Sequence, residues 1–118
     1  MLAGQGGSDL LIGYGGADIF AFTSSIYVGS IDQIADFQVG LDKIGLDDGE
    51  FAGLSLGALA AGAFRIGTAA QDADDRIIYD STTGALYFDA DGNGAGAQVQ
   101  FANLSNGLAL TANDFSVI

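Results

Sequence analysis

Aspartate is the residue type in this sequence with the clearest capacity for chemistry. The chain carries fifteen acidic residues, fourteen Asp and Glu50, against three cations, and its net charge is −12. It has no Cys and no His, which excludes the usual nitrogen and sulfur ligands of zinc and any nucleophile–base pair built on Cys or His. Oxygen is the remaining ligand class, and it suits Ca²⁺ or Mg²⁺. Because the short Asp side chain also fits tight turns, the composition favours bound hard cations over a merely solvated acidic surface.

Charge and hydropathy also exclude two classes of partner. Binding to nucleic acid needs a basic patch, which Lys43, Arg65 and Arg76 cannot form among so many acids. No apolar run approaches the roughly 18 residues of a transmembrane helix, so we predict no stable insertion into a membrane. The length of 118 residues predicts one domain, 1–118. No signal peptide follows Met1, and the glycine-rich start indicates a piece of a longer chain.

Two consecutive nine-residue segments share one glycine pattern. Segment 4–12 reads GQGGSDLLI and segment 13–21 reads GYGGADIFA. Glycines permit the φ > 0 turns that direct backbone carbonyl oxygens inward, and the Asp that ends each turn adds a carboxylate. A pair of glycine-rich hairpin loops is the alternative, but the matching period favours calcium. The predicted metal-binding positions are Gly4, Gly6, Asp9, Gly13, Gly15 and Asp18.

The repeat resembles the calcium-binding nonapeptide of RTX proteins. Segment 31–44, IDQIADFQVGLDKI, is similar to the sequence that follows the last repeats in serralysin-type C-terminal domains, and segment 72–91 resembles the tail of RTX proteins. The resemblance implies a parallel β-roll closed by further β-structure, and secretion from a bacterium by a type I secretion apparatus. Because one coil of such a roll uses two nonapeptides, we expect about one coil here. Asp32 and Asp36 either supply missing calcium ligands or are solvated charges at a strand edge.

A second acidic loop matches the first half of an EF-hand loop. Asp89, Asp91 and Asn93 occupy its first, third and fifth positions. Gln100 stands where an EF-hand has its bidentate carboxylate, and the flanking residues alternate like strands. The loop is therefore either a weak calcium site with these three ligands or an acidic Asn-Gly turn. The acids at 72–75 are predicted to form a solvated loop.

Short apolar segments bounded by Gly, Asn, Asp or Ser predict strands throughout the chain. One helix is predicted within 54–63, with Ser55 as its cap, and a hairpin turn at 79–85. The predicted fold is mostly all-β: a short parallel β-roll coil formed by the repeats at 4–22, continued at 23–118 by a β-sandwich-like cap with one or two short helices. The predicted strands are 19–22, 31–37, 43–46, 76–79, 85–88, 99–101 and 115–118.

The chain ends with Asp114 followed by Phe115, Ser116, Val117 and Ile118. This ending resembles the uncleaved type I export signal, and it also reads as a final strand that docks on the sheet. The leading hypothesis is a non-enzymatic domain that folds on Ca²⁺ outside the cell, with any catalytic domain upstream. The alternative is a structural or adhesive module that associates through the open edge of the roll. An enzyme with an acid pair is the third hypothesis, and the placement of the Asp residues in turns disfavours it.

Overall fold

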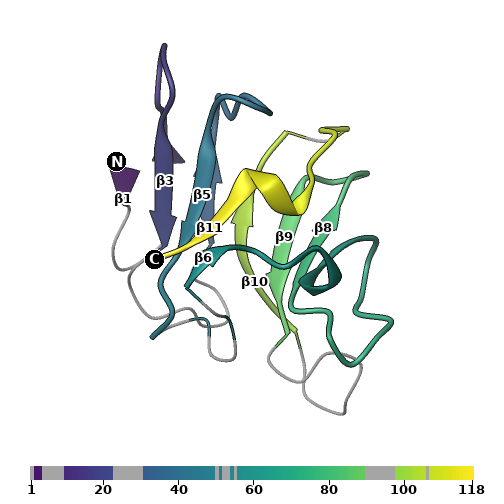
Figure 1. The fold of residues 1–118 in the computed structure, drawn as a ribbon. Coiled ribbons are helices and arrows are strands. Elements are labelled where there is room, and N and C mark those ends of the chain that lie inside the picture. The colour runs from purple at the N-terminus through teal and green to yellow at the C-terminus, as the bar shows by residue number, and fades with distance from the viewer. Residues whose placement is uncertain are drawn as a thin grey trace.

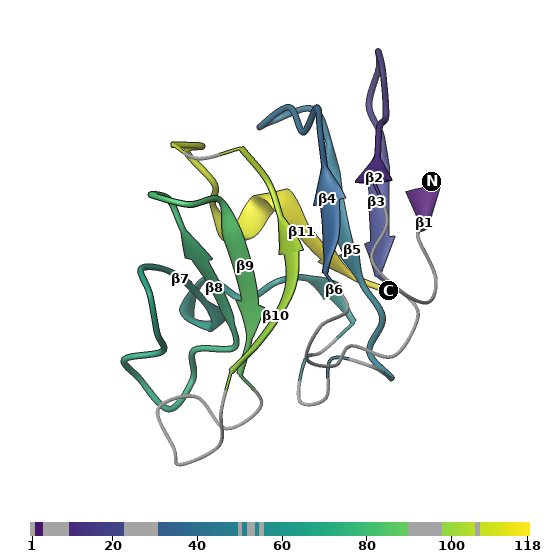
Figure 2. The same cartoon turned by 180° about the vertical axis from the view of Figure 1, so that it is seen from behind.

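A computed structural model describes residues 2–3, 10–22, 31–49, 51, 54, 56–89, 98–105 and 107–118. These residues form eleven strands in two mixed sheets and two short 3-10 helices (Figures 1 and 2). In strand order, the five-stranded sheet contains β1 (Leu2–Ala3), β3 (Ile19–Phe22), β5 (Lys43–Leu46), β11 (Phe115–Val117) and β6 (Gly57–Ala58). The six-stranded sheet contains β2 (Leu10–Leu11), β4 (Asp32–Ile34), β10 (Val99–Asn103), β9 (Ala85–Phe88), β8 (Ile77–Asp80) and β7 (Phe64–Ile66).

The first five strands wind between the two sheets as a parallel β-roll. In one sheet β1, β3 and β5 are neighbours, with Leu2 opposite Phe20 and Phe20 opposite Ile44. In the other sheet β2 pairs in parallel with β4. The expectation of about one coil is therefore wrong, because the winding continues to residue 46. Inward-facing apolar residues such as Ile34 and Ile44, which are 3% and 0% exposed, allow segment 31–46 to continue the coil.

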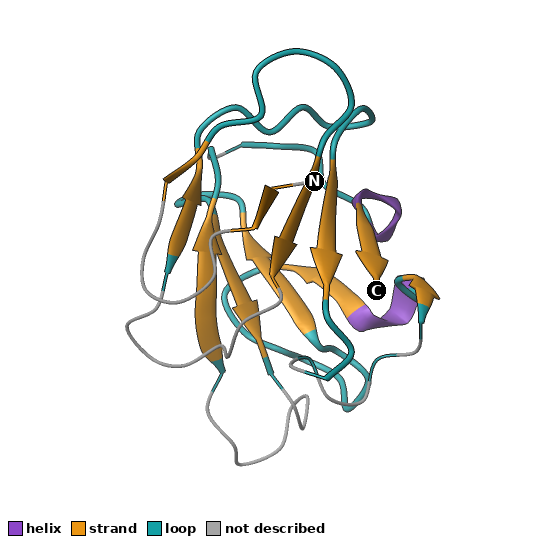
Figure 3. Cartoon of the chain, turned by 90° about the vertical axis from the view of Figure 1, so that its left-hand side faces the viewer, coloured by secondary structure: helices purple, strands orange, loops and turns teal. Residues whose placement is uncertain are grey.

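The remaining strands close the roll by extending both of its sheets. β10 pairs in parallel with β4, and β11 pairs in parallel with β5. Beyond β10 the six-stranded sheet continues as an antiparallel meander through β9 and β8. Seen from the side, the molecule has two layers of strands (Figure 3). The prediction of a short β-roll continued by a sandwich-like cap is confirmed.

Aromatic rings join the roll to the cap inside one hydrophobic core. Phe101 of β10 has its ring centroid 5.0 Å from that of Phe22 in the roll and 5.0 Å from that of Phe51. Phe51 also meets Phe88 of β9 at 5.2 Å, and all three pairs meet edge to face, an arrangement that aromatic quadrupoles favour. The roll and the cap therefore share their packing.

The short helix predicted within 54–63 is present only as three residues of 3-10 helix. That segment contains β6, which pairs with β11, and the 3-10 helix η1 (Ala61–Ala63). Ser55, its predicted cap, lies outside the described residues. The second 3-10 helix, η2 (Ala112–Asp114), has a capping box in which Thr111 and Asp114 exchange hydrogen bonds. Pairing with β11 overrides the weak helix propensity of the Ala- and Leu-rich segment.

Asp75 corrects the expectation of a solvated acidic loop at 72–75. Its side chain is 2% exposed, and its Oδ2 accepts hydrogen bonds from the Gln71 N–H (2.8 Å), the Asp72 N–H (3.0 Å) and Arg65 Nε (2.6 Å). Asp72 does remain solvated, with 67% of its side chain exposed, although it also pairs with Arg65. The difference arises because the loop folds back over Asp75, which a composition-based argument cannot anticipate.

We expect Asp75 to make the stability of the domain depend on acid. Burial alone raises the pKa of Asp75, but hydrogen bonds from Gln71, Asp72 and Arg65 outweigh it and hold the pKa below its ordinary value. Ionised Asp75 therefore stabilises the fold above about pH 4, and this contribution is lost as the pH falls through the lower folded pKa. Asp75→Asn should lower the melting temperature at neutral pH and flatten the acid limb of the stability curve. Thermal denaturation followed by circular dichroism at a series of pH values checks this, and an unchanged acid limb contradicts it.

Tyr79 provides a second test of the cap. Its side chain is 0% exposed, and its hydroxyl donates to the Ser105 carbonyl (2.6 Å) and accepts from the Leu108 N–H (3.2 Å). Tyr79→Phe removes both bonds and should destabilise the domain by about 1–3 kcal/mol, measured by urea denaturation. The matched control is Tyr87→Phe, because the Tyr87 hydroxyl has no hydrogen bond within the described part of the chain. A similar loss in both variants would show that the Tyr79 bonds contribute little.

Candidate metal site

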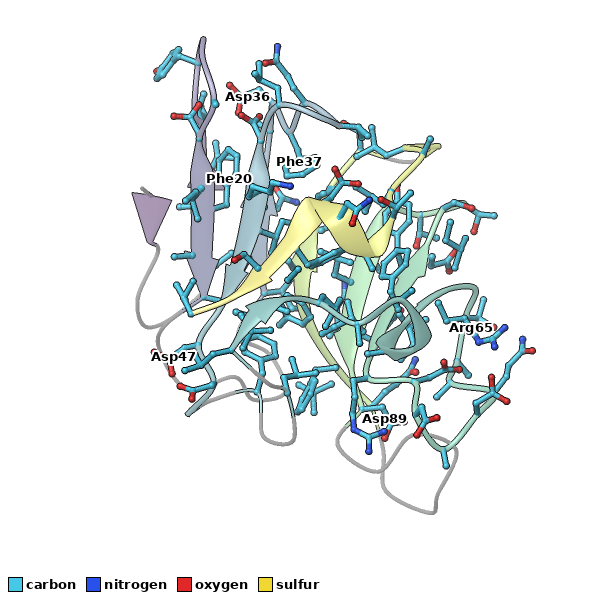
Figure 4. The ribbon with its side chains drawn as sticks, viewed as in Figure 1. Phe20, Asp36, Phe37, Asp47, Arg65 and Asp89 are labelled. Carbon is cyan, nitrogen blue, oxygen red and sulfur yellow. The ribbon has the colours of Figure 1, made fainter. Side chains whose placement is uncertain are left out.

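Two turns lie side by side at one end of the roll. Turn 12–18 joins β2 to β3, and turn 35–42 joins β4 to β5 (Figure 1). Asp36 ties them together, since its Oδ1 accepts from the Gly13 N–H (2.8 Å) and its Oδ2 from the Tyr14 N–H (2.6 Å). Figure 4 shows Asp36 at this end of the molecule, above the ring of Phe37. Both carboxylate oxygens of Asp36 therefore accept hydrogen bonds from the backbone of the second repeat, 13–21.

Asp18 is held by its backbone, while one of its carboxylate oxygens has no partner. Its N–H donates to Asp42 Oδ1 (2.9 Å), and its carbonyl accepts from the Lys43 N–H (2.8 Å). Asp18 Oδ2 is buried and has no hydrogen-bond partner among the described residues. A buried carboxylate oxygen without a partner is energetically unfavourable, and a bound cation is a partner that would satisfy it.

The glycines of turn 12–18 differ in what they do. A Cβ at Gly13 would lie 2.5 Å from Asp18 Oδ2 and 3.0 Å from the ring of Phe20, so only glycine leaves room for the carboxylate. Tyr14 and Gly16 have positive φ angles of 63° and 83°, where glycine is favoured. A Cβ at Gly15 would meet nothing within 4 Å. The turn thus brings the predicted residues Gly13, Gly15 and Asp18 together in one loop.

Asp42 is the residue that the sequence reasoning missed. It is 1% exposed, and its two oxygens accept from the Asp18 N–H and from the Gln38 N–H, each at 2.9 Å. It therefore fixes the backbone of the turn that carries Asp18. Its position could have indicated it, because Asp42 follows Gly40 in the same segment as the predicted ligand Asp36. Asp32 is placed apart from this arrangement, in β4 opposite Ala102 of β10, and is buried at 6% exposure.

The second acidic loop begins at the other end of the molecule. Asp89 follows β9, is 6% exposed, and donates its N–H to the Arg76 carbonyl (2.9 Å); Figure 4 shows it far from Asp36. Gln98 precedes β10, and its Nε2 donates to the Thr68 carbonyl (2.9 Å). Its Oε1 is buried and has no hydrogen-bond partner in the part of the chain that the structure describes. The predicted residues that lie outside the described part of the chain are Gly4, Gly6, Asp9, Asp91 and Asn93.

Carboxylates alone do not form a metal shell in the described residues, where no three Asp or Glu side chains are grouped closely enough to hold an ion. A cation beside Asp18 would therefore need carbonyl oxygens of the turns as further ligands, which is the ligand type that Ca²⁺ accepts. Within the same residues, no helix qualifies as a membrane span.

Comparison with known proteins supplies a family for this arrangement. The family model described as "Peptidase M10 serralysin C terminal" matches residues 2–117. The match thus includes the repeats, the turns around Asp18 and Asp42, the cap and the final strand. A search of curated proteins found no match.

Proposed function

The chain belongs to the peptidase M10 serralysin C-terminal family, and from this premise we propose that it is a calcium-dependent folding module. Serralysins are secreted bacterial proteases, and this chain is their non-catalytic C-terminal domain, with the catalytic domain elsewhere. The family assignment confirms the expectation that the chain is not itself an enzyme. The proposal concerns what this domain does for the protease: it binds calcium, and it folds when calcium is present.

The observation that carries the proposal is the unpartnered, buried Oδ2 of Asp18. Asp18 would hold the ion together with carbonyl oxygens of its turn, of which Gly13 and Gly15 are the predicted donors. A bound calcium ion would be the positively charged partner that this carboxylate oxygen lacks. In the folded domain, Asp42 and Asp36 hold the two turns in place through backbone amides, and they thereby position Asp18 for the ion.

Net charge provides the second part of the argument. At −12 the folded domain concentrates negative charge that opposes compaction. An ion that binds only the folded turns stabilises them by mass action, by about 2.7 kcal/mol at one hundred times its dissociation constant. In low cytosolic calcium the chain would stay less folded and suited to a type I secretion apparatus. External calcium would then complete folding, and the C-terminal segment would serve as the export signal.

Thermal melting of the 118-residue chain tests this function. We expect a higher melting temperature in millimolar Ca²⁺ than in EDTA, with a smaller effect of Mg²⁺, because Mg²⁺ demands tighter octahedral geometry and gives up its water reluctantly. Circular dichroism measures both the melting temperature and the β-structure. Identical spectra and melting curves in EDTA and Ca²⁺ would refute calcium-dependent folding.

The loop that begins at Asp89 is proposed as a second, weaker calcium site. Asp89, Asp91 and Asn93 are its candidate ligands. The buried Oε1 of Gln98, which has no hydrogen-bond partner among the described residues, follows the same loop in the chain. Isothermal titration calorimetry should then show two classes of site in the wild type and one in Asp89→Asn. If both proteins bind the same number of ions, the loop is an acidic turn.

The edge of the roll favours self-association as a second candidate function. β1 and β2 lie at the ends of their sheets, where backbone groups of an edge strand can pair with another chain. Leu10 of β2 is 60% exposed. Sedimentation velocity over a range of concentrations tests this candidate, and a constant sedimentation coefficient would remove it.

A further inference from the structure

Turn 35–42 makes contacts on two sides. Toward the repeats, Asp42 accepts the N–H of Asp18. Toward the C-terminus, the Gly40 N–H donates to Asp114 Oδ1 at 3.3 Å. Asp42 and Asp114 are 1% and 4% exposed, so both contacts place buried carboxylates against backbone amides. One short turn therefore contacts both the candidate calcium ligand and the last segment of the chain.

The C-terminal segment depends on this neighbourhood for its position. The Thr111 N–H donates to Asp114 Oδ2 at 2.8 Å, and Lys43 Nζ donates to the Asn113 carbonyl. Directly afterwards β11 runs in parallel beside β5, which follows turn 35–42 in the chain. Phe115 and Val117 of β11 are 1% and 3% exposed. Asp114 and Lys43 thus hold the entrance of the final strand.

The end of the strand is fastened to the same part of the roll. The Ile118 N–H donates to the Leu46 carbonyl (2.8 Å), and the Asp48 N–H donates to the Ile118 carbonyl (3.1 Å). A Cβ at Gly45 would lie 3.1 Å from Ile118 Cδ1 and 3.2 Å from Ile19 Cγ2. Gly45 therefore lets the side chains of Ile19 and Ile118 approach each other over β5. The docked segment consequently reaches β3, which begins directly after Asp18.

We propose that turn 35–42 couples calcium binding at Asp18 to the docking of residues 111–118, so that each stabilises the other. The proposal rests on the calcium-binding function proposed above. Its two states are the docked and the released C-terminal segment, since terminal elements are the usual sites of local opening. Release frees the Gly40 amide from Asp114 and removes β11, one of the two neighbours of β5. Turn 35–42 then holds the Asp18 backbone less firmly, and calcium meets a less organised site.

The coupling has a consequence for export. The residues that resemble the export signal, Asp114 to Ile118, include side chains that are buried when β11 is docked. Calcium that favours docking would therefore withdraw this signal once folding is complete. Because linkage is reciprocal, complete release of the segment must weaken calcium binding by the same factor by which calcium strengthens docking.

The test measures both directions of the linkage in the full chain. Hydrogen exchange with mass spectrometry is recorded for residues 113–118 in EDTA and in saturating Ca²⁺, with β8 as the internal reference. Calcium should slow exchange in 113–118 by about fivefold or more relative to β8. Calorimetric titration of Asp114→Ala with Ca²⁺ should show a reduced affinity, by at most the same factor, because the variant weakens docking without removing the β11–β5 pairing. Lys43→Ala removes only the exposed hydrogen bond from Lys43 Nζ to the Asn113 carbonyl and should show a smaller reduction in calcium affinity. This variant tests the coupling even if Asp114→Ala fails to fold.

Asp80→Ala is the matched control. Asp80 also caps a turn through its carboxylate, which accepts from the N–H and hydroxyl of Thr82 (3.0 and 2.6 Å), but it lies at the end of β8 in the other sheet. Its calcium affinity should equal that of the wild type. Unchanged affinity in Asp114→Ala and Lys43→Ala, or equal slowing of exchange in β8 and 113–118, overturns the coupling. Absence of calcium binding in the wild type is a different result, and it overturns the proposed function itself together with the coupling.

Discussion

Replacing Asp18 by Asn is expected to remove most of the stability that calcium adds to this domain. At one hundred times the dissociation constant, one ion adds about 2.7 kcal/mol in the wild type. Asn has one carbonyl oxygen and no charge, so the variant should retain little of this gain. The effect is measured as the difference between the free energies of unfolding in Ca²⁺ and in EDTA, obtained from urea denaturation.

The same substitution should have the opposite effect without calcium. In EDTA the wild type keeps a buried carboxylate oxygen without a partner, which is unfavourable by about 1–3 kcal/mol. A neutral Asn lowers that penalty, so Asp18→Asn should be at least as stable as the wild type in EDTA. The variant should therefore be less stable than the wild type in Ca²⁺ but not in EDTA. This reversal distinguishes a calcium ligand from a residue with a purely structural role.

The control for Asp18→Asn is Asp48→Asn. It removes the same charge from an exposed position in the turn after β5, where the side chain has no hydrogen bond within the described residues. Its gain in calcium should equal that of the wild type. If both variants respond to calcium as the wild type does, Asp18 is not a ligand, even if the domain binds calcium elsewhere.

Gly84→Ala is expected to destabilise the cap more than any other single-methyl change at a described glycine. Gly84 has φ +86°, and a Cβ there would lie 2.0 Å from the Leu104 carbonyl oxygen, a backbone atom that cannot rotate away. The Leu104 N–H also donates to the Gly84 carbonyl at 2.7 Å, so separating the two segments breaks a buried contact. Strain and overpacking together predict a loss of about 3 kcal/mol or more.

Substitutions at two other glycines separate the backbone strain at Gly84 from the steric overlap with Leu104. Gly107 has φ +73° and open space around its Cβ position, so Gly107→Ala measures the cost of the left-handed conformation alone, about 1 kcal/mol. Gly62 has open space and no positive φ, and Gly62→Ala should be neutral or slightly stabilising. Urea denaturation gives the three free energies. Equal losses for Gly84→Ala and Gly107→Ala would mean that Gly84 and Leu104 move apart without a penalty.

The observed strands show how much of the secondary structure can be predicted from local sequence patterns. The predicted strands at 19–22, 43–46 and 85–88 have the bounds observed for β3, β5 and β9. Each of these short segments directly follows an Asp or Gly (Asp18, Asp42 and Gly84), so neighbouring residues indicate where it begins. The segment at 31–37 was predicted too long, because Ala35 to Phe37 enter the turn whose carboxylate holds Gly13 and Tyr14. That contact depends on a residue 23 positions away.

The candidate site was likewise only partly predictable from the sequence. The nine-residue period singled out Asp18 and Gly13, and the structure places the Asp18 carboxylate against Gly13. The period gave no indication of Asp42, whose contribution is a hydrogen bond across 24 positions. Neither could composition distinguish Asp75, which is buried, from Asp72, which is exposed. Both carboxylates lie in the same loop, and only the folding of that loop decides which one loses water.

The restriction to oxygen ligands, the β-rich architecture and the serralysin resemblance were determined by the sequence alone, because each rests on residue types and on spacing within short segments. The tertiary structure alone decided that the roll continues to residue 46 and that the final strand docks beside β5. It also decided that one carboxylate oxygen of Asp18 is buried without a hydrogen-bond partner among the described residues. Those features come from pairings between residues far apart in the chain. Their free energy depends on which groups lose water together, and a one-dimensional pattern contains no record of that.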